Sequence, residues 1–404
     1  MDIPYRMEVL WCRAFQAALK IANYFIPYRM PQRLEGPGKI RELGIFLKGK
    51  GINDVLVVTG SGMIRRGQVQ PMLDGFEACG IRYTLQTYDT TDPTSDDVEL
   101  GYRTYKENGC KSIVAIGGGS RIDCAKGIAA KVVHPQKTLA QLRGILKVHW
   151  PIPPFIAIPT TSGAGSETTV AAVITDSVTH RKAAINDPFL IPKYAVLDST
   201  LTVDLPPHTT ATTGMDALAH AVEAYTNATY NTKLENRLAK EAVKLIYDNI
   251  LVAYEDGSNL EARQNMQLGA FYAGRAFTRS CVGYVHAIGH TLGSLYGVAH
   301  GLAMAVLLPH VMRAYGTSAH KRLAELADVC GIAGENDAEK ANGFLRWIEE
   351  TNVKMGLPNK FDMIKDEDIG QMITWAKEEA HPLYPVPMVW AHEDFRRVIE
   401  SIQK

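Results

Sequence analysis

Short β-branched runs alternate with helix-length segments between residues 54 and 198. Continuous apolar strands separated by helices are typical of a parallel sheet that is covered by helices on both faces. The alternation therefore predicts an α/β domain with a parallel sheet. Its candidate strands are Val55–Thr59, Arg82–Thr87, Ser112–Ile116, Phe155–Ile158, Val170–Ile174 and Ala195–Leu197, and the helices that follow the first three are 64–79, 95–108 and 120–132.

The pattern changes at Pro206-Pro207, because two backbone-restricted residues stop regular structure. From residue 209 onward helical periodicity dominates and no strand is predicted. We expect an α/β domain at 31–205 and an all-α domain at 206–404, with the cleft between them as the default ligand site. The predicted C-terminal helices are 233–254, 260–277, 300–314, 318–330, 338–355, 366–380 and 392–402.

Residues 8–25 are rich in apolar side chains and could suggest a signal peptide. Polar residues interrupt this run at helix-like intervals, however, and no small-residue cleavage site follows. We expect instead an N-terminal helical extension over 1–30. The pentapeptide Ile-Pro-Tyr-Arg-Met occurs on each side of it, at Ile3–Met7 and Ile26–Met30, without a physical explanation. The helix is predicted to be amphipathic, with one side formed by Leu10, Ala14, Ala17, Ala18, Ile21 and Phe25.

The 404 residues carry 43 basic and 43 acidic side chains, so the formal net charge is zero. A neutral chain has no overall field that attracts nucleic acid or anionic lipid. No apolar run reaches the roughly 18 residues of a membrane span. We therefore expect no nucleic acid and no membrane partner. The six cysteines form no C-x-x-C pair, which indicates a reduced, cytoplasmic location.

Two loops that follow candidate strands are rich in glycine and hydroxyl side chains. Gly117-Gly118-Gly119-Ser120 leads into a helix that carries Asp123 and Lys126. Such a junction directs backbone N–H groups and a helix dipole at a ligand, usually phosphate. The spacing matches no standard fingerprint, so a plain tight turn remains the alternative. The second loop, Pro159–Glu167, suits a nicotinamide, a ribose or a phosphate, or is simply a capped turn.

Asp216 and His220 lie four residues apart, and His286 and His290 repeat that spacing. Residues at i and i+4 share one face of a helix, which suits two ligands of one metal ion. His300 follows after a glycine-punctuated segment that can turn the chain back. Imidazoles with one carboxylate suit Zn²⁺ or Fe²⁺ and suit Ca²⁺ or Mg²⁺ poorly. Any one of these histidines could be a buried structural residue, but the two pairs together predict a metal site.

Five motifs stand in one order along the chain: GGGSxxDxAK at Gly117–Lys126, IPTTxGxGSE at Ile158–Glu167, GxDALxHAxEAY at Gly214–Tyr225, HxxxHxxGxxxGxxHG at His286–Gly301 and LLPHVM at Leu307–Met312. In this order they resemble the iron-dependent, or group III, alcohol dehydrogenase family. The resemblance covers residues from about 30 to 400. It implies a Rossmann-like dinucleotide-binding domain followed by an all-α metal-binding domain, the architecture of dehydroquinate synthase.

By motif position, the resemblance also implies roles for single residues. The metal, Fe²⁺ or Zn²⁺, would be held by Asp216, His220, His286 and His300. His290 would lie near the metal without binding it, as a catalytic candidate in the proton path or as a neutral structural residue. The dinucleotide would be bound at the pyrophosphate by Gly118, Gly119 and Ser120, elsewhere by Asp123, Thr160, Thr161 and Thr169, and at a ribose by Lys182.

The activity implied is hydride transfer between NAD(P)(H) and a small alcohol or aldehyde whose oxygen is bound to the metal. Phe277 and the stretch 381–387 could shape an apolar substrate pocket or could be packing residues. We also expect a homodimer or a higher homo-oligomer. The alternatives are a glycerol-dehydrogenase-type polyol oxidoreductase, a dehydroquinate-synthase-like cyclase, and a metal-binding protein without catalysis.

Two positions depart from the best-known NAD-using members of this family. Those enzymes carry Asp after the first strand, where this chain has Gly60 in the run Val58–Gly62. Without that carboxylate a 2′-phosphate is not repelled, and Gly60–Gly62 leave room and N–H donors for it. We therefore predict that NADP(H) is favoured over NAD(H). Asp92 stands where such members often have Asn, and no consequence is assigned to it.

Overall fold

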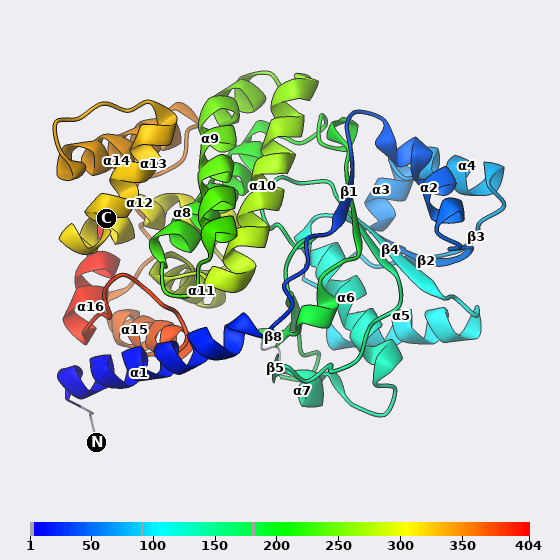
Figure 1. The fold of residues 1–404 in the computed structure, drawn as a ribbon, viewed down its shortest axis with the longest axis horizontal. Helices are drawn as coiled ribbons and strands as arrows, with labels where there is room; N and C mark the ends of the chain where they lie inside the picture. Colours follow the sequence, from blue (N-terminus) through cyan, green and yellow to red (C-terminus); the bar gives the residue numbers. More distant parts are fainter. Residues whose placement is uncertain (1–3, 90–91, 180–181) are drawn as a thin grey trace. The chain divides into compact units, whose positions relative to one another are not determined.

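The computed structural model describes residues 4–89, 92–179 and 182–404 (Figure 1). The chain divides into two compact units, and each is assembled from separate stretches of sequence. Unit 1 comprises Met1–Ile26, Leu205–Gly257 and Leu268–Lys404, whereas unit 2 comprises Pro27–Asp204 and Ser258–Gln267. The N-terminal helix thus groups with the helical C-terminal part of the chain, and a short helical stretch near residue 260 groups with the α/β part.

Unit 2 is built on a six-stranded parallel sheet with the strand order β1-β9-β6-β4-β2-β3. β2 has its sequence neighbour β3 on one side and β4 on the other. The strand order therefore reverses between β2 and β4, and ligands of such sheets bind at the carboxyl ends of the strands beside that reversal. The strands are β1 (Gln32–Glu35), β2 (Asp54–Thr59), β3 (Arg82–Thr87), β4 (Ser112–Gly117), β6 (Phe155–Pro159) and β9 (Tyr194–Leu197).

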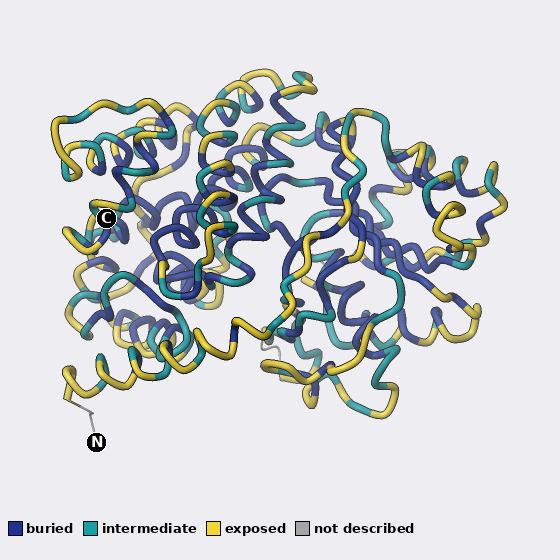
Figure 2. Tube along the Cα trace, viewed as in Figure 1, coloured by how far each residue is buried: buried dark blue, intermediate teal, exposed yellow. Residues whose placement is uncertain are grey.

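Helices cover both faces of this sheet, as its apolar strands predict. Val55 and Val57 of β2 pack into one core with α2 (Leu43–Gly49) and α4 (Gln70–Ala78). The alternate residues of the same strand, among them Leu56, pack into a second core with α5 (Ser95–Glu107) and α6 (Gly119–Val133). The four central strands β9, β6, β4 and β2 are buried almost throughout, whereas the edge strands β1 and β3 are partly exposed (Figure 2).

Three sequence-based expectations about unit 2 need correction. The run 170–174 does not join the parallel sheet: β7 (Ala171–Thr175) pairs antiparallel with β8 (Lys182–Asn186), and β8 pairs with β5 (Gly144–Ile145) in a separate three-stranded sheet. Its alternating burial is typical of an antiparallel sheet with one solvated face. The predicted helix 64–79 is two helices, α3 (Ser61–Arg65) and α4, because Gly67 adopts a left-handed φ of 71° between them. The short strands β1, β5 and β8 were not predicted, since they lack an apolar run.

Unit 1 is helical, and α8 (Pro207–Thr226) is its central helix. From Thr210 to Thr226 only Thr213 is less than fully buried. A helix that is buried on all sides belongs to a core. α8 packs on α9 (Lys233–Glu255) and on α12 (His300–Ala314), and α12 packs on α11 (Tyr284–Tyr296). The other helices are α1 (Tyr5–Tyr24), α13 (Thr317–Cys330), α14 (Asp337–Lys354), α15 (Asp366–Ala380), α16 (His392–Ser401) and the part of α10 (Leu260–Ser280) that begins at Leu268.

α1 is the expected amphipathic helix, but it attaches through its polar side. Glu8 pairs with His381 at 2.9 Å and with Lys377 at 3.0 Å, and Gln16 Nε2 donates to two backbone carbonyls of the segment after α15. The predicted apolar side is exposed instead (Figure 2). The first copy of the pentapeptide begins at Ile3, which lies outside the described residues. Among the described residues, no helix is long and apolar enough to cross a membrane.

Candidate metal centre and nucleotide loops

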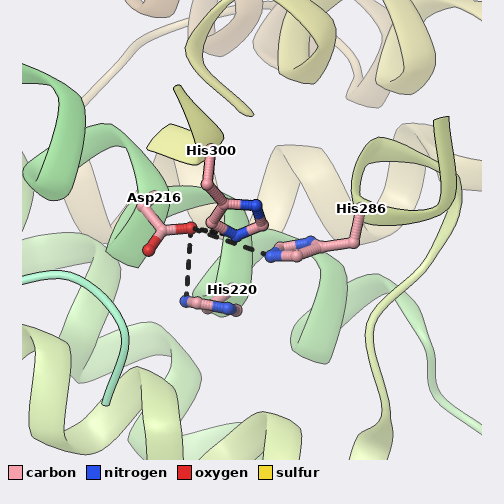
Figure 3. Close-up of side chains that lie close together, drawn as sticks. All are labelled: Asp216, His220, His286 and His300. Atoms are coloured by element: carbon pink, nitrogen blue, oxygen red, sulfur yellow. Dashed lines mark ion pairs between the residues drawn. The ribbon is translucent and has the colours of Figure 1, made fainter. Parts of the chain in front are cut away.

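Three helices of unit 1 bring together four side chains that the sequence separates by 84 residues. α8 carries Asp216 and His220 one turn apart, α11 carries His286 in its first turn, and α12 begins at His300. We call these four residues the Asp–His cluster. Figure 3 shows the three imidazoles arranged around the carboxylate of Asp216. One ligand atom from each residue lies within 4.8 Å of the ligand atoms of the other three.

Distances within the Asp–His cluster are short and similar. Oδ1 of Asp216 lies 3.3 Å from Nε2 of His300, 3.8 Å from Nε2 of His286 and 3.9 Å from Nδ1 of His220. Two ligands that each bind a tetrahedral metal at about 2.1 Å are about 3.4 Å apart. The side chains are therefore already spaced almost as such an ion requires.

Glycines allow the helices to approach closely enough for this spacing. A Cβ at Gly301 would lie 2.3 Å from the backbone oxygen of Thr212, so only glycine lets the start of α12 contact α8. Gly297 ends α11 in the left-handed conformation, with φ 67°. The chain then turns back within three residues and begins α12 at His300. The glycines of this segment are thus explained by the turn between α11 and α12 and by the close contact of α12 with α8.

Two polar atoms of the cluster are buried without a hydrogen bond. Among the residues that the structure describes, Oδ1 of Asp216 and Nε2 of His286 are both in this condition. Leaving such an atom unsatisfied costs about 1–3 kcal/mol, and more when the atom is charged. These two atoms lie 3.8 Å apart inside the cluster. One carboxylate and three imidazoles fit a divalent metal such as Fe²⁺ or Zn²⁺, and a bound cation would satisfy both orphaned atoms.

Glu223 orients His286 from the side away from the cluster. Nδ1 of His286 donates to Oε2 of Glu223 at 2.5 Å, while Oε1 of Glu223 accepts from the backbone N–H of Val285 at 2.7 Å. With a proton held on Nδ1, Nε2 is the ring atom that faces the cluster and could bind a metal. Burial lowers the pKa of His286, but the carboxylates of Glu223 and Asp216 outweigh burial and raise that pKa to about 9.

His290 lies beside the cluster and outside the four-residue group. Its ring stacks on that of His300 with centroids 5.3 Å apart. Nδ1 of His290 donates to both oxygens of Glu379 at 2.9 Å, and the hydroxyl of Tyr384 donates to Glu379 as well. The side chain of His290 is 43% exposed, which does not fit the alternative of a buried structural histidine. Phe277, on α10, stacks on the ring of His220 with centroids 4.2 Å apart.

In unit 2 the two glycine- and hydroxyl-rich loops lie side by side, because β4 and β6 are neighbours in the sheet. Thr160 N–H donates to the carbonyl of Gly117 at 3.0 Å. A Cβ at Gly119 would lie 2.7 Å from Cβ of Ala164, and one at Gly118 would touch Thr161. Ser120 lies in the first turn of α6. The structure therefore brings together the residues that the sequence suggested for the pyrophosphate and two of the threonines.

Asp123, Thr169 and Lys126 lie beneath these loops and bond to protein atoms. Asp123 accepts from Ser166 Oγ at 2.5 Å and from Val173 N–H at 3.0 Å. Nζ of Lys126 donates to the carbonyl and to Oγ1 of Thr169, at 2.8 and 2.9 Å. Burial lowers the pKa of Lys126 to about 8, although the carboxylate of Asp123 acts in the opposite direction. These contacts hold the loop 159–167 in place.

Two other predicted nucleotide residues lie apart from the loops. Lys182 begins β8 in the smaller sheet, where its Nζ pairs with Asp92 at 2.9 Å; this gives Asp92 the contact that its sequence position did not suggest. Gly60 directly follows β2, and the side chain of Arg121 lies over it.

Arg121, Glu223 and Glu379 were missed by the sequence analysis. Glu223 had a signal, since it lies seven residues after Asp216 on the same helix face.

Comparison with known proteins identifies the family. The model of the iron-containing alcohol dehydrogenases matches residues 31–199, and that of the C-terminal part of the Fe-containing alcohol dehydrogenase family matches residues 210–402. The chain is 34% identical over 385 residues to the NAD-dependent methanol dehydrogenase of Bacillus methanolicus, covering 94% of this chain and 100% of that one. It is 33% identical to the NADPH-dependent butanol dehydrogenase of Clostridium saccharobutylicum, over 84% of this chain and 90% of that one.

A solved structure of 1,3-propanediol oxidoreductase superposes with a TM-score of 0.87 at 31% identity, covering 94% of this chain and 100% of that chain. The chain belongs to the iron-containing alcohol dehydrogenase family, which confirms the resemblance seen in the motifs. It is a metal-dependent, NAD(P)-dependent oxidoreductase that acts on the CH–OH group of alcohols. The matches do not favour the polyol dehydrogenase or the cyclase.

Proposed function

We propose that the Asp–His cluster is the metal site of this enzyme, with Asp216, His220, His286 and His300 as ligands of Fe²⁺ or Zn²⁺. The observation that carries the proposal is the convergence of four ligand atoms within 4.8 Å, with two buried polar atoms unsatisfied among them. A structural cluster of histidines would pair these atoms with protein groups. A metal site leaves them for the ion.

A divalent metal supplies Lewis acidity toward the substrate oxygen, and the nicotinamide exchanges the hydride. The chain's own residues prepare the site for this chemistry. Glu223 holds the proton of His286 on Nδ1, so that Nε2 faces the cluster. His290 is held by Glu379 next to His300, where it can take up or release the proton of the alcohol through Nε2. The ring of Phe277 against His220 offers an apolar wall that suits a small alcohol or aldehyde.

We further propose that the cofactor is NADP(H) in preference to NAD(H). The relatives do not decide this, because one is named NAD-dependent and another NADPH-dependent. Support comes from the end of β2, where Gly60 stands in place of a carboxylate that would repel a 2′-phosphate. A kcat/KM with NADPH at least tenfold above that with NADH is expected. The reverse ratio would overturn the preference and leave the metal site untouched.

Metal analysis of single variants tests the metal site. His286→Ala and His220→Ala should each lose the bound metal and almost all activity, because each removes one of only four ligands. His290→Ala should keep the metal and lose turnover. His392→Ala, at an exposed position on α16, serves as the control and should change neither. Full activity in His286→Ala would defeat the assignment, and loss of metal in His290→Ala would make His290 a ligand.

We also propose that the enzyme works in the reduced cytoplasm as a homodimer or a higher homo-oligomer. All six cysteines are unpaired thiols, which supports a reducing location. The exposed side of α1, with Leu10, Ile21 and Phe25 each more than two-thirds exposed, supports association, because such an apolar surface is unfavourable in water. Light scattering of the purified protein should give a mass of at least twice 44.4 kDa. A monomer at micromolar concentration would contradict this.

A further inference from the structure

The space above Gly60 is filled by the side chain of Arg121. A Cβ at Gly60 would lie 3.1 Å from Nε and 3.4 Å from Nη2 of Arg121. A larger residue here would crowd the guanidinium, so glycine favours its close approach to the end of β2. The sequence suggested that Gly60–Gly62 leave room for a phosphate; in the structure Gly60 leaves room for a cation that can bind one.

Arg121 belongs to the first turn of α6 and is held in a defined position. Its stem crosses Gly117, where a Cβ would lie 2.5 Å from Cγ of the arginine. Its guanidinium carbon lies 4.1 Å from the ring centroid of Tyr88, close enough for a cation–π contact. The hydroxyl of Tyr88 in turn donates to the carbonyl of Ser120 at 2.8 Å. The guanidinium therefore lies at the carboxyl ends of β2, β3 and β4, beside the reversal in strand order.

Two more arginines approach the same turn from α3 and the residue after it. A Cβ at Gly62 would lie 3.2 Å from Nη1 of Arg66 and 3.8 Å from Nη2 of Arg65. Arg65 also donates to Ser61 Oγ at 3.0 Å. We call Arg65, Arg66 and Arg121 the arginine cluster. Asp89 is the carboxylate next to it: it accepts from Ser61, and the hydrogen bond from Ser61, followed by the charges of Arg65 and Arg121, lowers the pKa of Asp89.

We propose that Arg121 binds the 2′-phosphate of NADP(H) and is the main residue that selects this cofactor, with Arg65 and Arg66 adding positive charge. The inference rests on the proposed NADP(H) preference and names the residue behind it. In open α/β sheets a dinucleotide binds at the carboxyl ends of the strands beside the reversal in strand order, with its pyrophosphate at the glycine turn and its adenosine ribose at the end of another strand. Here the glycine turn follows β4, and the strand across the reversal is β2, which ends directly before Gly60. The guanidinium is directed at Gly60, at the ribose end. A planar guanidinium binds a phosphate monoester through two parallel N–H···O bonds.

Binding of adenosine fragments tests this without any turnover. Isothermal titration would compare 2′,5′-ADP, which carries the 2′-phosphate, with 5′-AMP, which lacks it. The wild type should bind 2′,5′-ADP at least tenfold more tightly. Arg121→Gln should lose about 10- to 100-fold in affinity for 2′,5′-ADP, as expected for one charge-assisted pair, and less than threefold for 5′-AMP. Arg121→Lys, which keeps the charge and lacks the fork, should fall between them.

Arg103→Gln is the matched control. Arg103 lies on α5 of the same unit, 65% exposed and 3.9 Å from Glu99, and its removal should change neither affinity. An equal loss for both fragments in Arg121→Gln would assign Arg121 to the phosphate that they share and overturn the inference. Unchanged binding, or a larger loss in Arg65→Gln or Arg66→Gln, would also overturn it. In each of these outcomes the wild type would still bind 2′,5′-ADP more tightly than 5′-AMP, so the NADP(H) proposal itself would stand. A wild type without that preference refutes the NADP(H) proposal itself.

Discussion

The Asp–His cluster and the nucleotide loops both contain buried polar side chains, but they use them in opposite ways. In the cluster, Oδ1 of Asp216 and Nε2 of His286 have no hydrogen bond within the described chain. Beneath the loops, both oxygens of Asp123 and the ammonium of Lys126 are bonded to protein atoms. A buried polar atom without a hydrogen bond gains free energy when it binds a ligand, whereas the hydrogen-bonded groups beneath the loops fix the loop backbone.

The two regions therefore depend on different parts of the chain, the cluster on side-chain atoms and the loops on the backbone. The proposed metal ligands are side-chain atoms, so replacing one removes a bond to the ion. The glycine turn would bind a pyrophosphate through backbone N–H groups, so its side chains act by support. One substitution, Asp to Asn, can therefore be made in both regions with opposite expectations.

The largest effect is expected for Asp216→Asn. The amide is a far weaker ligand than the carboxylate and carries no charge to balance the cation. Metal content, measured by plasma mass spectrometry on protein purified with added Fe²⁺, should fall below about a tenth of the wild-type value, and turnover should fall about 1000-fold or more. If Asp216→Asn retains both metal and turnover, Asp216 is not a metal ligand, and the contrast with Asp123 fails.

Glu223→Gln should have the next largest effect. The amide nitrogen of Gln would donate to Nδ1 of His286 and drive the ring proton onto Nε2, the proposed ligand atom. Metal affinity should drop by about 10- to 100-fold, a typical cost of losing such a carboxylate partner, while circular dichroism stays unchanged. Glu349→Gln, which alters an exposed pair with Arg313, is the control. An unaltered metal affinity would show that Glu223 does not position His286.

Metal binding should depend on pH through His286. Because its pKa is raised to about 9, Nε2 is protonated at neutral pH and the metal must displace that proton. Metal affinity should therefore rise up to tenfold per pH unit between pH 7 and 9 and level off above. The pKa of Asp216 is held well below its ordinary value, since His220 and His300 outweigh the effect of burial, so Asp216 does not compete with metal in this range.

The stability of the metal-free fold should change with pH in the opposite direction to the metal affinity. A raised histidine pKa contributes stability that is fully present below the unfolded pKa, about 6.5, and is lost as pH rises through 9. The protein prepared with chelator should thus lose stability over the range in which it gains metal affinity. Titration calorimetry in buffers of different ionisation enthalpy, near pH 7.5, should report about one proton released per metal bound. Absence of proton release would contradict the role of His286.

The smallest effect is expected for Asp123→Asn. Asn can still accept from Val173 N–H and donate to Ser166 Oγ, so only the charge opposite Lys126 is lost. We expect a decrease of about 1 kcal/mol in the free energy of unfolding, measured by urea denaturation, and a full complement of metal. Loss of metal in this variant would break the separation between the two regions.

Much of the fold was predictable because its signals are local. Apolar strands separated by helices indicated the parallel sheet, and the i,i+4 spacing of Asp216 and His220, and of His286 and His290, indicated that the members of each pair share a helix face. Other features carried no local signal. Whether β7 joins the main sheet depends on its partner, and the apolar side of α1 is exposed because Glu8 and Gln16 find bonding partners in the segment around residue 381.

The class of chemistry could be inferred from the sequence, because helix periodicity places residues at i and i+4 on one face and the motif order indicated the family. The groups that support this chemistry could be found only after the helices and strands were placed in three dimensions. Glu223 meets His286, Glu379 meets His290 and Arg121 covers Gly60 through contacts between residues 61 to 89 positions apart. Such contacts arise when helices and strands pack, and no pattern within one segment can encode which side chain another segment will bring to it.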